Sequence, residues 1–173
     1  ALALPLELEA AAFDTRRLLA AAGRSLMSQS ERMRQARFAL DALARYAEQE
    51  DSYTFYDLFR QESHLNEAVR TPELTGRAVR VLGMLGTPAA QKRLVEVASD
   101  SSRNIEDRRA AAEAFKLAIH RRGLLLTRAD VWHQHDLYNQ SENFDQGTQE
   151  VLGMILDALE APLQKTADGQ AGQ

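Results

Sequence analysis

Small and aliphatic side chains recur at one helical spacing in four segments of the chain, and this repetition constrains the fold more than any other feature. When the segments are aligned, Ala39, Val81, Ala114 and Val151 are equivalent, at intervals of 42, 33 and 37 residues. Helical repeat arrays have periods of about 33 to 47 residues. The spacing therefore predicts stacked helix pairs with a continuous core. The alternative is an ordinary helical bundle in which the rows coincide by chance.

Start and stop signals divide the chain into eight predicted helices. Thr71-Pro72-Glu73 and Thr87-Pro88 each combine a capping side chain with a proline in the first turn. No segment alternates with a period of two, so no strand is predicted. The fold class is all-α, an α-solenoid of about four antiparallel helix pairs. The predicted pairs are 5–22 with 28–49, 53–69 with 72–85, 88–99 with 104–122, and 127–138 with 144–160.

The two ends of the chain carry separate predictions. Pro162 indicates that the last helix ends near Glu160. Residues 164–173 are predicted to be a disordered tail, because Gln, Gly, Ala, Lys and Asp cannot bury a face. Residues 1–163 are then one helical repeat domain. The chain does not begin with methionine, and we expect it to be part of a longer protein.

Charge and composition exclude several classes of function. The net charge is −4, so nucleic acid is not expected as a partner. The chain has no cysteine, which excludes thiolate nucleophiles and cysteine-bound zinc and fits a reducing compartment. No apolar run is long enough to span a bilayer, and Ala1–Pro5 is too short for a signal peptide. We therefore expect a cytoplasmic protein without a cofactor.

The repeated segments resemble HEAT repeats, in which the first helix ends in Asp and the second reads roughly Val-Arg-x-x-Ala-Ala-x-Ala-Leu-x-x-Leu-Gly. Leu94 to Asp100 followed by Arg108 to Phe115 matches this pattern, as does Arg77 to Gly86. Segments 34–43 and 148–155 match less closely. The resemblance covers most of residues 28–160. It implies a right-handed superhelix of the armadillo-like kind, whose second helices line a concave, protein-binding surface.

On each second helix, the side opposite the Ala/Leu row is then expected to face the concave surface. Basic side chains outnumber acidic ones along this stripe, and arginine pairs bidentately with carboxylates. The predicted ligand is therefore a protein or an acidic peptide. A solvated face on which neighbours such as Glu113 and Lys116 merely pair is the alternative. The predicted partner-binding residues are Arg37, Arg45, Arg80, Arg109 and Lys116.

One aromatic and histidine-rich cluster, Trp132-His133-Gln134-His135-Asp136, invites a metal assignment. Two histidines two residues apart on a helix point about 200° away from each other, whereas helical zinc pairs need a step of three or four. No metal site is therefore predicted. Trp132 is expected in the core or at its edge. The segment from Asp136 to Asp145 could be a recognition loop that reaches past the end of the array. The favoured prediction is a lid over the last core layer, with Tyr138 and Phe144 turned inward.

The favoured hypothesis is a non-enzymatic HEAT-repeat adaptor or regulatory module that binds a protein through its concave surface. An enzyme on the same scaffold, of the cofactor lyase or metal-dependent hydroxylase type, is one alternative. A structural domain that packs on a missing neighbour through Leu2, Leu4 and Leu6 is another. No catalytic residue is predicted, and the oligomeric state is left open.

Overall fold

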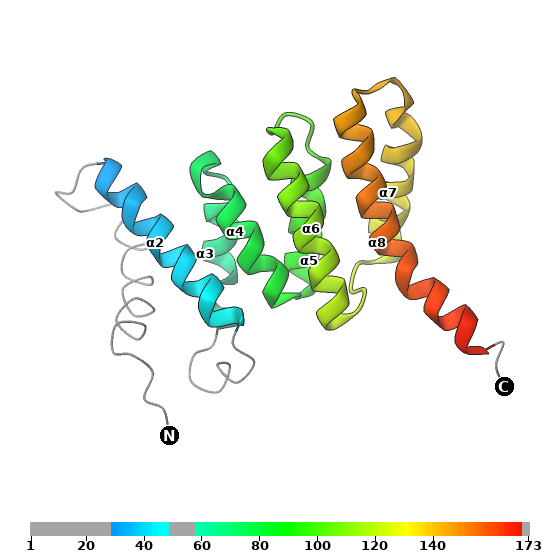
Figure 1. Ribbon diagram of the computed structural model, residues 1–173, viewed down its shortest axis with the longest axis horizontal. Helices are drawn as coiled ribbons and strands as arrows, with labels where there is room; N and C mark the ends of the chain where they lie inside the picture. Colours follow the sequence, from blue (N-terminus) through cyan, green and yellow to red (C-terminus); the bar gives the residue numbers. More distant parts are fainter. Residues whose placement is uncertain (1–28, 49–57, 171–173) are drawn as a thin grey trace. The chain divides into compact units, whose positions relative to one another are not determined.

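The computed structural model describes residues 29–48 and 58–170, with side chains up to Ala161. This part of the chain is all-α, as predicted, and contains seven α-helices, with contacts mostly between neighbours in sequence (Figure 1). Two 3₁₀ helices, Leu58–Gln61 and Ser141–Asn143, lie between them. The α-helices are α2 (Gln29–Glu48), α3 (Glu62–Ala68), α4 (Pro72–Leu85), α5 (Pro88–Ser99), α6 (Ile105–Arg122), α7 (Arg128–Gln140) and α8 (Gln146–Gln170).

Helix starts agree with the sequence where a capping signal is present. Helices α4 and α5 have the predicted bounds, and the Ala90 amide donates to Thr87 Oγ1 at 3.0 Å. Helices α6 and α7 begin one residue after Asn104 and Thr127, whose side chains accept hydrogen bonds from backbone amides of the first turn. A local side chain that satisfies a free amide is enough to set these boundaries.

Other boundaries differ from the prediction. The segment predicted as a helix from 53 to 69 has a 3₁₀ turn at 58–61 before α3, and its first residues lie outside the described part. The helix predicted over 5–22 also lies outside it. Helix α8 does not end before Pro162 but continues to Gln170, because a proline removes one helical hydrogen bond without always ending the helix. The predicted tail, 164–173, thus begins within α8, and its disorder stays a prediction.

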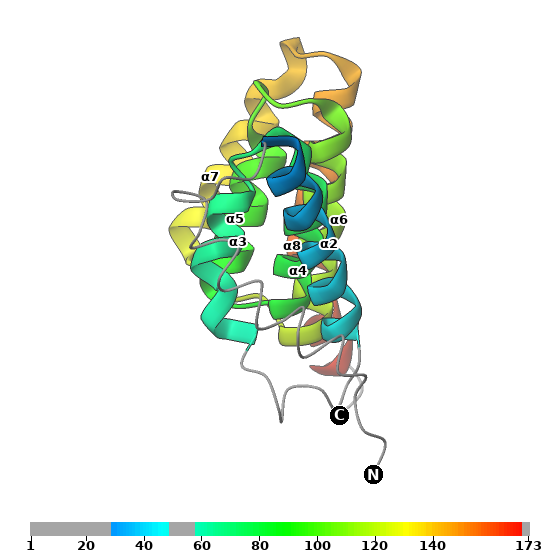
Figure 2. The ribbon, with the colours of Figure 1, turned by 90° about the vertical axis from the view of Figure 1, so that its left-hand side faces the viewer.

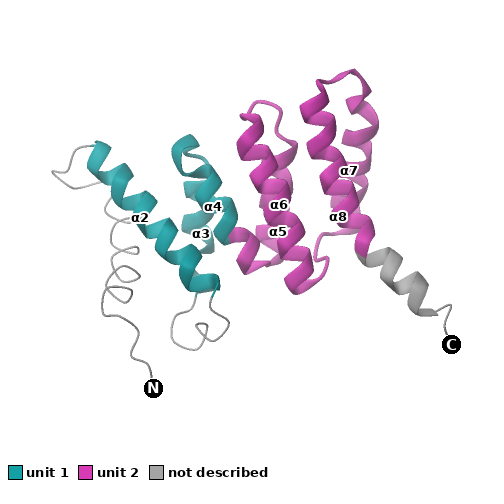
Figure 3. Ribbon diagram, viewed as in Figure 1, with its two compact units in different colours: residues 1–81 teal, residues 82–173 magenta. Residues whose placement is uncertain are grey.

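The chain divides into two compact units, residues 1–81 and 82–173, with the boundary inside α4 (Figure 3). In the first unit, α2 and α4 are joined by two exposed ion pairs. Arg77 Nε lies 3.0 Å from Asp41 Oδ1, and Arg80 donates to Glu48. The buried faces of these helices carry the Ala/Leu row, including Leu43. All four aligned positions, 39, 81, 114 and 151, are buried, which confirms the core face predicted from the repeats.

The second unit has two layers of helices. Helices α6 and α8 form one layer and α5 and α7 the other (Figures 1 and 2). Leu94, Phe115 and Ile155 are completely buried between the layers. Ser99 Oγ donates to Gln134 Oε1 at 2.7 Å and joins α5 to α7. This arrangement places α6 and α8 side by side along one face of the unit.

A buried arginine links three helices of this unit. Arg108, only 3% exposed, donates from Nε to the Ala98 carbonyl at 3.0 Å and from one guanidinium nitrogen to Thr148 Oγ1 at 2.7 Å. Thr148 in turn donates to Asp145 Oδ2 at 2.7 Å. Desolvation lowers the pKa of Arg108, while the charges of Asp145 and Asp100 oppose that shift. The network holds the end of α5 and the starts of α6 and α8 together.

The aromatic residues near α7 are exposed, contrary to the sequence prediction. Trp132 is 59% exposed, Tyr138 41% and Phe144 50%, so neither a core tryptophan nor a lid with inward aromatics is observed. The apolar side chains of α7 do not form one stripe but are spread around the helix. Only a narrow face can therefore pack on the rest of the unit, and Gln134 is its one buried side chain.

Acid is expected to destabilise the protein through Asp145. Hydrogen bonds from Thr148, followed by the charge of Arg108, hold the pKa of Asp145 below its ordinary value of 3.8. The unfolded chain therefore binds a proton that the folded chain does not, and stability is lost as pH falls from about 5 through the folded pKa. Melting temperatures measured between pH 5 and pH 3 are expected to fall less steeply for Asp145→Asn than for the wild type. Equal slopes would contradict this assignment.

Candidate binding groove between α6 and α8

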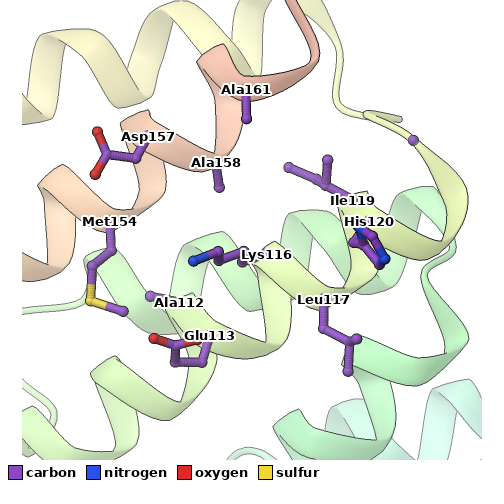
Figure 4. A pocket seen from close by; sticks show the side chains of 11 residues that line it. Ala112, Glu113, Lys116, Leu117, Ile119, His120, Met154, Asp157, Ala158 and Ala161 are labelled. Atoms are coloured by element: carbon purple, nitrogen blue, oxygen red, sulfur yellow. The ribbon is translucent and has the colours of Figure 1, made fainter. Parts of the chain in front are cut away.

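A groove of about 800 Å³ lies between the second half of α6 and the middle of α8 (Figure 4). Its size lies within the range of ordinary ligand pockets, and it is partly open to solvent. Both helices belong to the second unit. The residues that line it are Ala112, Glu113, Lys116, Leu117, Ile119, His120 and Gly123 on the α6 side, and Met154, Asp157, Ala158 and Ala161 on α8.

The groove exists because α6 and α8 separate along their length. Near their first turns the helices are tied together, since Arg109 donates to Glu150 Oε2 at 2.7 Å and Arg108 donates to Thr148. Further along, α8 diverges from α6 (Figure 1). The walls there carry small residues, Ala112, Ala158 and Ala161 among them. Short side chains cannot fill the space between diverging helices, so it stays available to a ligand.

These two contacts, Arg109 with Glu150 and Arg108 with Thr148, also set which residues of α6 and α8 lie opposite each other across the groove. Helices α6 and α8 run in parallel, and Arg109 lies opposite Glu150. The offset in sequence between Arg109 and Glu150, applied further along both helices, places Glu113 opposite Met154 and Lys116 opposite Asp157. One turn later His120 lies opposite Ala161. The groove therefore has Glu113 at one end, Lys116 and Asp157 on opposite walls in the middle, and His120 at the other end.

The ionisable side chains of the groove are not used by the fold. No ion pair joins any of these groups to another residue of the described part of the chain. The groups are Glu113, Lys116, His120 and Asp157. Figure 4 shows Lys116 extending into the space between the two helices. Apolar side chains lie between the charges, and Leu117 is 36% exposed there. Such a surface offers both apolar contact and charges with which a ligand can pair.

A buried glutamine holds the far end of the groove in place. Gln91 is completely buried, and its Nε2 donates to the Gly123 carbonyl at 2.7 Å while its Oε1 accepts from the Leu125 amide at 2.9 Å. Gly123 has a φ of +78°, a left-handed value that suits glycine, and donates to the Ile119 carbonyl at 2.8 Å. The loop that closes α6 is thus fixed before a ligand arrives.

The structure separates the predicted partner-binding residues. Only Lys116 lines the groove. Arg109 lies on the same helix but pairs with Glu150, and the hydrogen bond that it donates to this carboxylate raises the pKa of Arg109. Arg37, Arg45 and Arg80 belong to the first unit.

Two of the three first-unit arginines already have intramolecular partners. Arg80 donates to Glu48, and Arg45 Nε donates to the Asp41 carbonyl at 3.3 Å. Arg37 is exposed on α2, without an ion pair to another described residue. The second helices thus carry basic side chains, but several neutralise acids on the same or a neighbouring helix.

The α8 wall of the groove was missed at the sequence level. Met154, Asp157, Ala158 and Ala161 share one face of a helix by their spacing, which is a usable signal. From periodicity alone such a face is predicted to lie in the core, because periodicity cannot show that α8 diverges from α6. The opposite charges of Lys116 and Asp157 could have marked the site only once the register was known.

Within residues 29–48 and 58–170, no three His, Cys, Asp or Glu side chains are grouped as metal ligands would be. Across the same residues, no helix combines the length and apolar character needed to cross a bilayer. His133 and His135 lie on α7, and the Trp132 ring packs near His135 at a centroid distance of 6.3 Å.

Comparison of the chain with protein-family models, with curated proteins and with solved structures found no match.

Proposed function

We propose that this chain is a non-enzymatic helical-repeat scaffold of the HEAT-like type, which binds a segment of a partner protein in the groove between α6 and α8. The observation that carries the proposal is the groove itself. It combines apolar side chains, among them the exposed Leu117, with four ionisable groups that have no ion pair to a described residue. Its end is fixed by Gln91. A preformed surface lowers the entropic cost of binding.

The solenoid part of the proposal rests on how the helices follow one another. Helices α5 and α6 pack as a pair, and so do α7 and α8, while α6 also packs against α8. Ion pairs join successive second helices within each unit, Asp41 with Arg77 in one and Arg109 with Glu150 in the other. Repetition of one contact type between neighbouring repeats is typical of a solenoid.

The charges of the groove favour a partner segment of mixed charge over a purely acidic one. The arginines that suggested an acidic peptide are largely engaged, since Arg80 pairs with Glu48 and Arg109 with Glu150. The groove offers Lys116 together with the carboxylates of Glu113 and Asp157. A ligand with acidic groups alone would leave these two carboxylates facing like charge.

Leu117→Glu is expected to reduce partner capture at least tenfold. Leu117 lines the groove, so a charge there would be desolvated by any bound segment. Trp132→Glu is the control, because Trp132 is a 59% exposed apolar side chain of the same unit that does not line the groove. Affinity capture from a lysate of the source cells, with quantitative mass spectrometry, measures both variants. Equal loss in the two, or no loss in either, would overturn the proposed site.

A further inference from the structure

We infer that the occupant of the groove is one amphipathic α-helix of the partner, running parallel to α6 and α8, with a basic residue at its start and an acidic residue about two turns later. This inference rests on the proposed function and specifies the ligand of the same groove. It follows from three properties of the groove, which are its shape, its length and the order of its charges.

The shape fits a helix. The groove is bounded by two parallel helices that diverge, and small residues on both walls, Ala112, Ala158 and Ala161, allow a third backbone to come close. An amphipathic helix enters such a groove with apolar side chains at i, i+3 or i+4, and i+7. Leu117 and Met154 are the contacts available to those side chains. An extended strand has no unpaired backbone here with which to form hydrogen bonds.

The length fits about three helical turns. The α6 wall runs from Ala112 to Gly123, which at 1.5 Å per residue is roughly 16 Å. A bound helix therefore contacts the α6 wall over about eleven residues, and the α8 wall, from Met154 to Ala161, over about two turns. This stretch is long enough to hold three apolar anchors and one charged residue at each end.

The order of charges sets the direction of the bound helix. Glu113 lies at the end nearest the first turns of α6 and α8, with Asp157 one turn further along. Lys116 lies opposite Asp157 on the α6 wall, and His120 lies one turn further along, at the other end. A helix parallel to α6 places its positive N-terminus near Glu113 and its negative C-terminus near His120. Basic residues in its first turn and acidic residues in its last complete the pairing across the groove.

Synthetic helical peptides test the inference directly. Two probes of about fourteen residues carry the same leucine and alanine anchors. One has lysines in its first turn and glutamates in its last, and the other has these charges exchanged. Fluorescence anisotropy with the full chain is expected to give at least tenfold tighter binding for the lysine-first probe. The doubly charge-reversed protein, Glu113→Lys with Lys116→Glu, is expected to lose or reverse this preference.

Two controls separate the inference from the proposed function. Leu117→Glu is expected to weaken the lysine-first probe at least tenfold, and Trp132→Glu to leave it unchanged; circular dichroism verifies that each variant is folded. Equal affinity for both probes, or binding that is insensitive to Leu117→Glu, overturns the inference. The proposed function would survive that result if capture from lysate still depended on Leu117. The proposed function would also be overturned if Leu117→Glu had no effect on capture from lysate.

Discussion

Replacing Arg108 with alanine is expected to lower the free energy of unfolding by about 3 kcal/mol, the range for disrupting a buried charged network. The arginine is buried where α5, α6 and α8 meet, and its removal leaves a cavity. It also removes hydrogen bonds to the Ala98 carbonyl and to Thr148 Oγ1. Buried acceptors without donors are costly, because water cannot replace the lost partner. Urea denaturation followed by circular dichroism measures the change.

The neighbouring arginine is the matched control for this prediction. Arg109 pairs with Glu150 and Glu106, but its side chain is 39% exposed. Exposed ion pairs contribute about 0 to 1 kcal/mol, because solvent screens them. Arg109→Ala is therefore expected to change stability by less than about 1 kcal/mol. A similar loss in the two variants would mean that burial of Arg108 is not what makes it important.

Gly83→Ala is expected to lower the free energy of unfolding by about 2 kcal/mol, although alanine is the better helix former. A Cβ at Gly83 would lie 2.7 Å from the Ala114 carbonyl oxygen and 2.9 Å from the Ala114 Cβ. Both atoms belong to α6, and a backbone oxygen cannot move aside as a flexible side chain can. The helices must separate by several tenths of an ångström, which loosens the packing around a completely buried Phe115.

The same substitution on α8 is expected to have the opposite sign. At Gly153 the nearest neighbour of a new Cβ is Tyr138 Cε2, at 3.8 Å, an ordinary contact. Gly153→Ala should therefore raise stability by about 0.5 to 1 kcal/mol through helix propensity alone. Thermal melts of the two variants, measured together with the wild type, test both predictions. Destabilisation of similar size at both positions would exclude close packing of α4 on α6 as the cause.

Local signals in the sequence were sufficient where structure depends on a few adjacent residues. Thr87 and Pro88 set the start of α5 because the cap and its amide lie three residues apart. The buried row that includes Ala114 and Val151 followed from helical periodicity. In both cases the interacting groups lie on one helix, so no knowledge of the neighbouring helices was needed.

Other features depended on how helices meet. Trp132 looked like a core residue by type, yet the narrow contact face of α7 leaves it exposed. Arg109 looked like a free cation, yet α8 brings Glu150 within 2.7 Å. The sequence gives the side chains that are present, but it does not show that Arg109 pairs with a residue 41 positions further along the chain.

The amino-acid sequence by itself determined that the described part of this protein is helical, where most of its helices begin, and which faces they bury. These properties arise from capping, proline geometry and side-chain period, all of which act over a few residues. Only the tertiary structure decided that α6 and α8 separate beyond their first turns, and that Lys116 and Asp157 lie on the two walls of the resulting groove. The reason is that helix divergence depends on long-range ties such as Arg108 to Thr148.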